Sequence, residues 1–170
     1  MIDRKRRNQY AEQLRHFAAG ILTVEEYEAR TEDLAFDTQD AALNAVWRAA
    51  WCLYDDFRTD RLRGEWALDT AARRQVARMI LFLYSDAEYR WPEDIRLDII
   101  GCLVSGVGSL LNKVTLGLCR SVFDPFLYHR WKEHQRWMRQ FGDLECWPFL
   151  ERGEFEAALQ KPRFFVGISH

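Results

Sequence analysis

A chain of 170 residues can form one domain with a substantial core, because folded chains of this length bury roughly two-thirds of the surface that they expose when unfolded. Its 48% hydrophobic content and its seven tryptophans exclude a disordered protein. The formal net charge of -2, from 24 basic and 26 acidic residues, excludes a general attraction of the chain to nucleic acid or anionic lipid.

The first two predicted helices form a tight hairpin. Residues 4–19 show helical spacing of apolar side chains, and Gly20 then supplies a left-handed stop. Thr23 is placed to cap the second helix, and Glu26 follows at the position that completes a capping box. The inward stripe of the first helix is Tyr10, Leu14 and Phe17. Because the stop and start signals are adjacent, the two helices are expected to pack against each other.

This hairpin follows a pattern in which a helix precedes Gly-x-Leu-Thr-x-Glu-Glu-aromatic and a second helix. The matching residues are Leu14, Ala18, Ala19, Gly20, Ile21, Leu22, Thr23, Glu25, Glu26, Tyr27, Glu28 and Arg30. Through this pattern, and through Thr38 and Leu43, residues 4–47 resemble the SHOCT-like bacterial helical module. The resemblance implies a small docking or oligomerisation element that carries no catalytic residues. The rest of the chain resembles no family that we can name.

Two further helices follow the hairpin. The third is predicted to begin near Asp37 or Thr38 and to reach Tyr54, and the polar residues 55–64 then form a loop. Asp69 is the expected cap of the fourth helix. The predicted inward stripes are Leu43, Trp47, Ala50, Trp51 and Tyr54 in the third helix, and Ala72, Val76, Met79, Ile80 and Leu83 in the fourth.

The second half of the chain is also predicted to be helical. Pro92 can begin a helix, which a group of glycines interrupts near residues 105–109, where a short strand is the main alternative. A helix over residues 124–141 and a short helix over residues 149–159 follow, and residues 164–168 form a terminal strand or an extended tail. The inward stripe predicted for the 124–141 helix is Leu127, Trp131, His134, Met138 and Phe141.

These elements predict a mainly α-helical fold. We expect a single-domain bundle of about six to seven helices over residues 1–170, with one short strand near the C-terminus as an alternative. In this bundle the hairpin of residues 4–47 packs on a helical body of residues 48–170. The hairpin alone is too small to keep a core of its own.

The cysteines and the amino terminus bear on the compartment. The cysteines are Cys52, Cys102, Cys119 and Cys146, and no two of them form a C-x-x-C pair. We expect buried free thiols in apolar surroundings. The amino terminus lacks the apolar segment of a secretory signal, and the uncharged residues 99–112 fall short of the ~20 that a membrane span requires. We therefore expect a cytoplasmic protein without a membrane partner.

The sequence contains no convincing catalytic or metal-binding pattern. His129 and His134 flank Glu133, but a five-residue separation turns two helical side chains about 140° apart, which does not suit two ligands of one zinc ion. The glycine-rich residues 106–112 lack the remaining features of a dinucleotide or phosphate loop, and no serine lies in G-x-S-x-G. We therefore assign no catalytic, cofactor-binding or metal residue.

Two aromatic segments give the strongest functional signal, because tyrosine, tryptophan and arginine are enriched at binding hot spots. The candidate protein-binding residues are Tyr84, Asp86, Glu88, Tyr89, Arg90, Trp91, Trp147 and Phe149. If exposed, they would form an aromatic and acidic patch suited to a basic protein partner. We expect a non-catalytic adaptor, regulator or neutralising partner of another protein, with homo-oligomerisation as a further form of contact.

Two alternatives stay open. A small enzyme would place His134 or Cys102 at the wall of a deep pocket. A nucleic-acid-binding protein would use the basic run Arg4, Lys5, Arg6 and Arg7, although such a run at a helix start is usually a solvated end. The binding hypothesis instead predicts an exposed apolar patch, rimmed by acids, near Tyr89 and Trp91.

Overall fold

A computed structural model gives the arrangement of the helices. It describes residues 1–54, 60–92, 133 and 135–161. Contacts divide the chain into two compact units, Met1–Arg90 with Glu145–His170, and Trp91–Leu144. The described residues are mainly helical and include no strand, which confirms the mainly α-helical prediction. The predicted strand at 164–168 and the glycine-rich segment lie outside the described residues, and the single domain stays a prediction.

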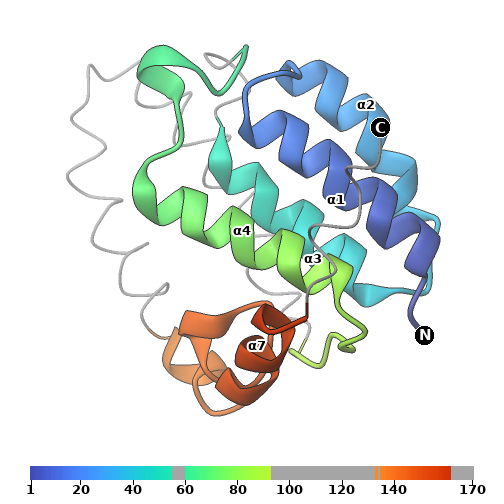
Figure 1. The fold of residues 1–170 in the computed structure, drawn as a ribbon, viewed down its shortest axis with the longest axis vertical. Helices are drawn as coiled ribbons and strands as arrows, with labels where there is room; N and C mark the ends of the chain where they lie inside the picture. The colour runs from blue at the N-terminus through green and yellow to red at the C-terminus, as the bar shows by residue number, and fades with distance from the viewer. Residues whose placement is uncertain (55–59, 93–132, 134, 162–170) are drawn as a thin grey trace. The chain divides into compact units, whose positions relative to one another are not determined.

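Four helices of the first unit pack against one another in a bundle. They are α1 (Arg4–Ala18), α2 (Val24–Phe36), α3 (Ala41–Ala50) and α4 (Thr70–Tyr84). α1 contacts both α2 and α4, and α3 contacts the same two helices (Figure 1). The other described elements are the 3-10 helices η1 (Trp51–Leu53), η2 (Gly64–Trp66) and η3 (Leu144–Cys146), and the helix α7 (Arg152–Leu159), which contacts α4.

The signals that separate α1 from α2 act as predicted. Gly20 adopts a φ of 67°, and a Cβ atom there would lie 2.5 Å from Cγ of Arg63, so that a larger residue would be strained as well as crowded. The Thr23 hydroxyl accepts the backbone N–H of Glu26 at 3.0 Å, and the Glu26 carboxylate accepts the N–H of Thr23 at 2.9 Å. The predicted capping box is confirmed.

The third helix begins later and ends earlier than predicted. Its cap is Asp40, whose carboxylate accepts the backbone N–H of Ala42 at 3.2 Å, and residues 37–39 form a bend before it. After Ala50 the chain tightens into η1, and this change of pitch turns Trp51 away from the inward stripe. Trp51 is 43% exposed, so its predicted inward placement is wrong.

The core of the first unit confirms the stripes predicted for α1 and α4. Its fully or almost fully buried members include Tyr10, Leu14, Phe17, Tyr27, Leu43, Val46, Val76, Met79 and Leu83. The ring of Phe17 stacks on that of Tyr27 at 4.2 Å, and the Asp69 carboxylate caps α4 by accepting the N–H of Ala72 at 2.7 Å. Helical periodicity therefore located most of this core.

Two buried tyrosine hydroxyls meet inside this core. The hydroxyl oxygens of Tyr10 and Tyr27 lie 2.7 Å apart. Burial, followed by the proximity of Tyr27, raises the pKa of Tyr10 well above its usual value, and burial likewise raises the pKa of Tyr27. Both hydroxyls therefore resist ionisation in the folded chain.

We expect this pair to limit stability in alkali. A folded pKa above the unfolded value of about 10 gives stability that is complete below that pH and is lost as the pH rises toward the folded pKa. The double variant Tyr10→Phe/Tyr27→Phe should keep its neutral-pH stability within about 1 kcal/mol and unfold at higher pH than the wild type. Urea unfolding followed by circular dichroism, from neutral to alkaline pH, measures both the neutral-pH stability and the pH at which each protein unfolds. Equal alkaline midpoints for the two proteins would contradict this assignment.

Several other predictions are corrected. Phe141 was predicted to face inward but is 46% exposed, because the helical residues end at Met138 and turns follow. The terminal helix begins at Arg152 and not near Phe149, after the separate turn of η3. Cys52 is exposed, whereas Cys146 is a buried free thiol as predicted, and the other two cysteines lie outside the described residues. None of the described helices has both the length and the apolar character needed to cross a membrane.

Candidate functional site

The tyrosines of the first predicted aromatic segment make internal contacts. The hydroxyl of Tyr84 donates to the Glu12 carboxylate at 2.7 Å, and burial, then this hydrogen bond, raises the pKa of Tyr84 to about 12. The half-buried ring of Tyr89 packs edge-on against Phe82, with 6.3 Å between the centroids. Both tyrosines therefore hold residues 84–90 against the helices.

The charged members of this segment lie on its outer side. Asp86 is exposed and pairs with Arg4 at 3.2 Å, and the exposed Arg90 pairs with Glu154 of α7. Glu88 is also exposed. These pairs connect the segment to α1 and α7, and surface pairs of this kind contribute little to stability individually.

The larger rings of the two segments do not form an exposed patch. Trp91 is 3% exposed and Phe149 is fully buried, so neither can contact a partner in this conformation. Trp147 is half-buried and packs against the core of the first unit. Phe149 anchors its segment on Phe82, with 5.0 Å between the ring centroids. The apolar patch expected near Tyr89 and Trp91 is therefore replaced by internal packing.

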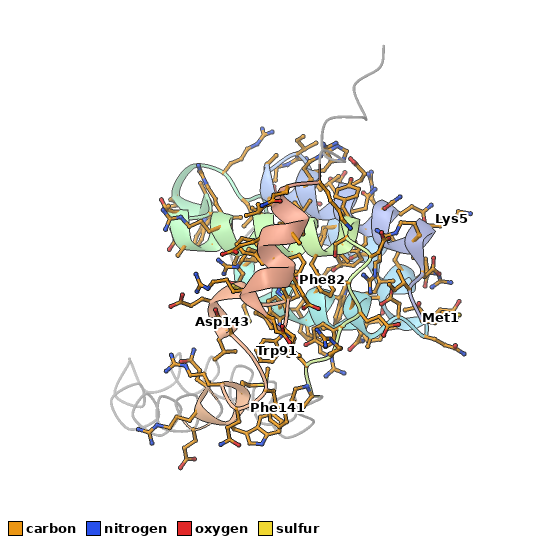
Figure 2. The ribbon with its side chains drawn as sticks, turned by 60° about the horizontal axis from the view of Figure 1, so that its bottom comes forward. Met1, Lys5, Phe82, Trp91, Phe141 and Asp143 are labelled. Carbon is orange, nitrogen blue, oxygen red and sulfur yellow. The ribbon has the colours of Figure 1, made fainter. Side chains whose placement is uncertain are left out.

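The basic run at the start of α1 is mostly occupied within the fold. Arg4 donates to the carbonyl oxygen of Leu83 at 2.7 Å and also to that of Ser85. Arg6 donates to the carbonyl oxygen of Asp33 at 2.9 Å and pairs with Asp37 at 3.1 Å. The solvated end expected from the sequence is thus wrong for these arginines. Lys5 projects outward from α1 (Figure 2).

Arg7 forms a buried ion pair with Asp40. Its Nε and Nη2 donate to the two carboxylate oxygens at 2.6 and 2.8 Å, and both side chains are less than 5% exposed. Arg7 also donates to the carbonyl oxygen of Ala87 at 2.7 Å and lies 5.2 Å from the centroid of the Phe82 ring. Burial alone would raise the pKa of Asp40, but the hydrogen bonds from Arg7 and from the N–H of Asp3 lower it.

This occupation of the arginines argues against the nucleic-acid hypothesis. Phosphate binding requires cationic side chains that are free to face the ligand. Arg4, Arg6 and Arg7 instead donate to carbonyl and carboxylate oxygens of the chain itself. Together they tie the start of α1 to the start of α3 and to the residues that follow α4. The basic run is therefore a structural element of the first unit.

A hollow of about 430 Å³ opens beside the start of α1. It is lined by Met1, Asp3, Arg6, Phe36, Asp37, Thr38, Gln39 and Asp40. Its lining contains neither cysteine nor histidine, and the described residues hold no group of three or more side chains that could bind a metal ion. The hollow is therefore a polar depression without either of the side-chain types that the enzyme hypothesis requires, and its carboxylates pair with Arg6 and Arg7.

An aromatic cluster borders this hollow, and we call it the aromatic surface. It consists of Phe36 at the end of α2, Trp47 in α3 and Trp51 in η1. The ring of Trp47 lies 4.6 Å from that of Phe36 and 4.3 Å from that of Trp51, measured between centroids. Trp47 is 7% exposed, whereas Phe36 and Trp51 are 50% and 43% exposed. Two half-exposed rings thus cover a buried third one.

The indole of Trp47 is incompletely satisfied. Its Nε1 is buried and has no hydrogen-bond acceptor among the described residues. A buried donor without an acceptor costs about 1 to 3 kcal/mol. The aromatic surface therefore combines exposed apolar area with an unsatisfied hydrogen-bond donor. A bound partner would cover the apolar area and could supply the missing acceptor.

The aromatic surface was not predicted from the sequence, because Trp47 and Trp51 fall on one predicted inward stripe and Phe36 belongs to no predicted stripe. The available signal was the spacing of α2, which places the buried Tyr27, Thr31 and Ala35 on one side and leaves Phe36 outside that stripe. No such spacing signal identifies Trp51, because its exposure follows from the change from α-helix to 3-10 helix after Ala50. Of the histidine group tested for zinc, only the exposed Glu133 is among the described residues.

Comparison with known proteins adds no relative to this description. Neither models of protein families, nor curated protein sequences, nor solved structures match the chain. The cysteine and histidine of the enzyme hypothesis, Cys102 and His134, lie outside the described residues. The aromatic surface has the aromatic composition that is enriched at protein-binding sites.

Proposed function

We propose that the chain is a non-catalytic protein-binding protein, acting in the cytoplasm as an adaptor, regulator or neutralising partner of another protein. The observation that carries this proposal is the aromatic surface, in which Phe36 and Trp51 are half exposed over the buried Trp47. Aromatic side chains bury a large area for little loss of conformational freedom, which makes them frequent anchors at interfaces.

The position of the surface also supports this proposal. It lies at the end of α2 and the start of η1, next to the polar hollow, so apolar contacts are bordered by polar ones. An apolar centre with a polar rim is the usual anatomy of a protein interface. The exposed Asp86, Glu88 and Arg90 stay predicted contact residues on a different part of the first unit.

The resemblance of residues 4–47 to the SHOCT-like module points to the same function, because such modules act as docking or oligomerisation elements. Phe36 lies within this range, and Trp51 follows it closely. We propose that this amino-terminal part of the chain supplies the binding surface and that the remaining helices support it.

The test is a capture experiment with the full-length tagged protein at its native level, followed by identification of partners by mass spectrometry. We expect one stoichiometric partner, and the double variant Phe36→Ala/Trp51→Ala should lose it. Truncation of one aromatic hot spot typically costs about 2 kcal/mol, so the affinity for the purified partner should fall at least about thirtyfold.

Trp66→Ala is the matched control, because Trp66 is 40% exposed in η2 and does not belong to the aromatic surface. This variant should retain the partner, and thermal unfolding should show that all three proteins are folded. A partner that the double variant retains with unchanged affinity would refute the aromatic surface as the binding site. The absence of any partner for the wild type would refute protein binding itself.

A further inference from the structure

The outer face of α2 carries a stripe of five exposed residues, three of them acidic, that ends at the aromatic surface. Its members are Glu25, Ala29, Glu32, Asp33 and Phe36, all of them exposed. Their spacings of four, three, one and three residues place them on one side of a helix. The stripe includes no lysine or arginine, and none of its three carboxylates forms an ion pair among the described residues.

From this arrangement we infer that the protein binds a basic segment of its partner along α2, with an apolar side chain of that segment seated on Phe36 and Trp51. This inference rests on the proposed function and adds the chemistry of the partner. The three carboxylates, Glu25 at one end and Glu32 with Asp33 two turns further on, attract cationic side chains and repel phosphates, so the stripe favours a basic polypeptide over nucleic acid or anionic lipid.

The dimensions of the stripe set the size of the segment. From Glu25 to Phe36 the helix rises about 16 Å at 1.5 Å per residue, which corresponds to about three helical turns in the partner. The indole N–H of Trp47, buried at the apolar end without an acceptor among the described residues, is a donor that a carbonyl oxygen of the bound segment would satisfy. Charge and apolar contact are thus presented in a fixed order along one helix.

A second copy of the chain is the other conceivable occupant. The exposed Arg73 and Arg74 of α4 are basic, but the exposed neighbours Ala71 and Ala77 on that helix are small and offer no large apolar anchor. Within α4 itself, the basic face therefore matches the acidic part of the stripe and not the aromatic surface; the exposed ring of Trp66 belongs to η2, outside that helix. For this reason we assign the surface to a different protein.

The test uses the full chain and a fluorescent synthetic peptide of about twelve residues, with lysines spaced four and three residues apart and a leucine pair at one end. We expect saturable binding by anisotropy at low ionic strength, weakened by salt. A peptide with glutamate in place of every lysine should not bind. The variant Glu25→Gln/Glu32→Gln/Asp33→Asn should bind the basic peptide at least about fivefold more weakly.

The control variant Glu65→Gln/Glu151→Gln/Glu156→Gln removes the same number of exposed carboxylates elsewhere and should bind like the wild type. Equal affinity of the two triple variants, or no saturable binding of the basic peptide, would overturn the inference. A dimer in sedimentation that Phe36→Ala/Trp51→Ala dissociates would overturn it in favour of a second copy. If Phe36→Ala/Trp51→Ala loses the captured partner but the acidic triple variant keeps it, the proposed protein binding is supported and the inference of a basic segment is refuted.

Discussion

Replacing Arg7 with methionine is expected to destabilise the folded chain by about 3 to 5 kcal/mol. Methionine keeps much of the volume of the side chain but leaves the Asp40 carboxylate, 4% exposed, without its cation. The carbonyl oxygen of Ala87 loses its donor in the same step. Two hydrogen bonds to Asp40 remain, from the N–H groups of Asp3 and Ala42, and they compensate the buried charge only in part.

Urea unfolding at neutral pH measures this effect, and a second substitution separates charge from volume. Arg7→Met/Asp40→Asn should recover much of the loss, because asparagine is neutral and still caps α3. The exposed pair of Arg15 and Glu12 provides the contrast, since Arg15→Gln should change stability by less than about 0.5 kcal/mol. A loss of under about 1 kcal/mol for Arg7→Met would show that the buried pair is not required.

The pH dependence of the same variant follows from Asp40. Because its folded pKa is lowered, the pair contributes stability that is present above the unfolded pKa of about 4 and is lost as the pH falls through the folded pKa. The difference in stability between wild type and Arg7→Met should therefore shrink in acid. A difference that stays constant down to low pH would assign the effect to packing instead of charge.

Phe82→Ala is expected to lower the free energy of unfolding by a similar amount, about 3 to 5 kcal/mol. Phe82 is 1% exposed and contacts the rings of Tyr89 and Phe149, with the guanidinium of Arg7 over its face. It belongs to a second core cluster that joins α4 to the residues around α7. Its removal opens a cavity at the junction of both aromatic segments.

Hydrogen exchange distinguishes a local from a global effect of this substitution. Residues 145–161 should exchange faster in Phe82→Ala than the α1–α2 hairpin, because Phe149 loses the ring on which it packs. Phe82→Leu should lose less stability, since it fills more of the cavity. Phe36→Ala serves as the matched control, because the same change at a 50% exposed phenylalanine should have little effect on stability. Uniform exchange across both regions would contradict a local role for Phe82.

The amino-acid sequence by itself determined the local features of the fold. The Gly20 stop, the Thr23 and Glu26 capping box, the Asp69 cap and the inward stripes of α1 and α4 were all predicted correctly. Each depends on residues within one or two helical turns of one another. Backbone geometry and short-range hydrogen bonds therefore suffice to specify them.

Only the tertiary structure decided how the charged and aromatic residues are used. Arg7 meets Asp40 across 33 residues and Ala87 across 80, and these contacts convert a basic run that looked solvated into an internal tie. Burial of Trp91 and Phe149, and exposure of Phe36 and Trp51, likewise place large exposed rings elsewhere than the predicted aromatic segments. Helical spacing tells which side chains share a face, but which face is covered depends on the helices that pack against it, and those come from distant parts of the chain.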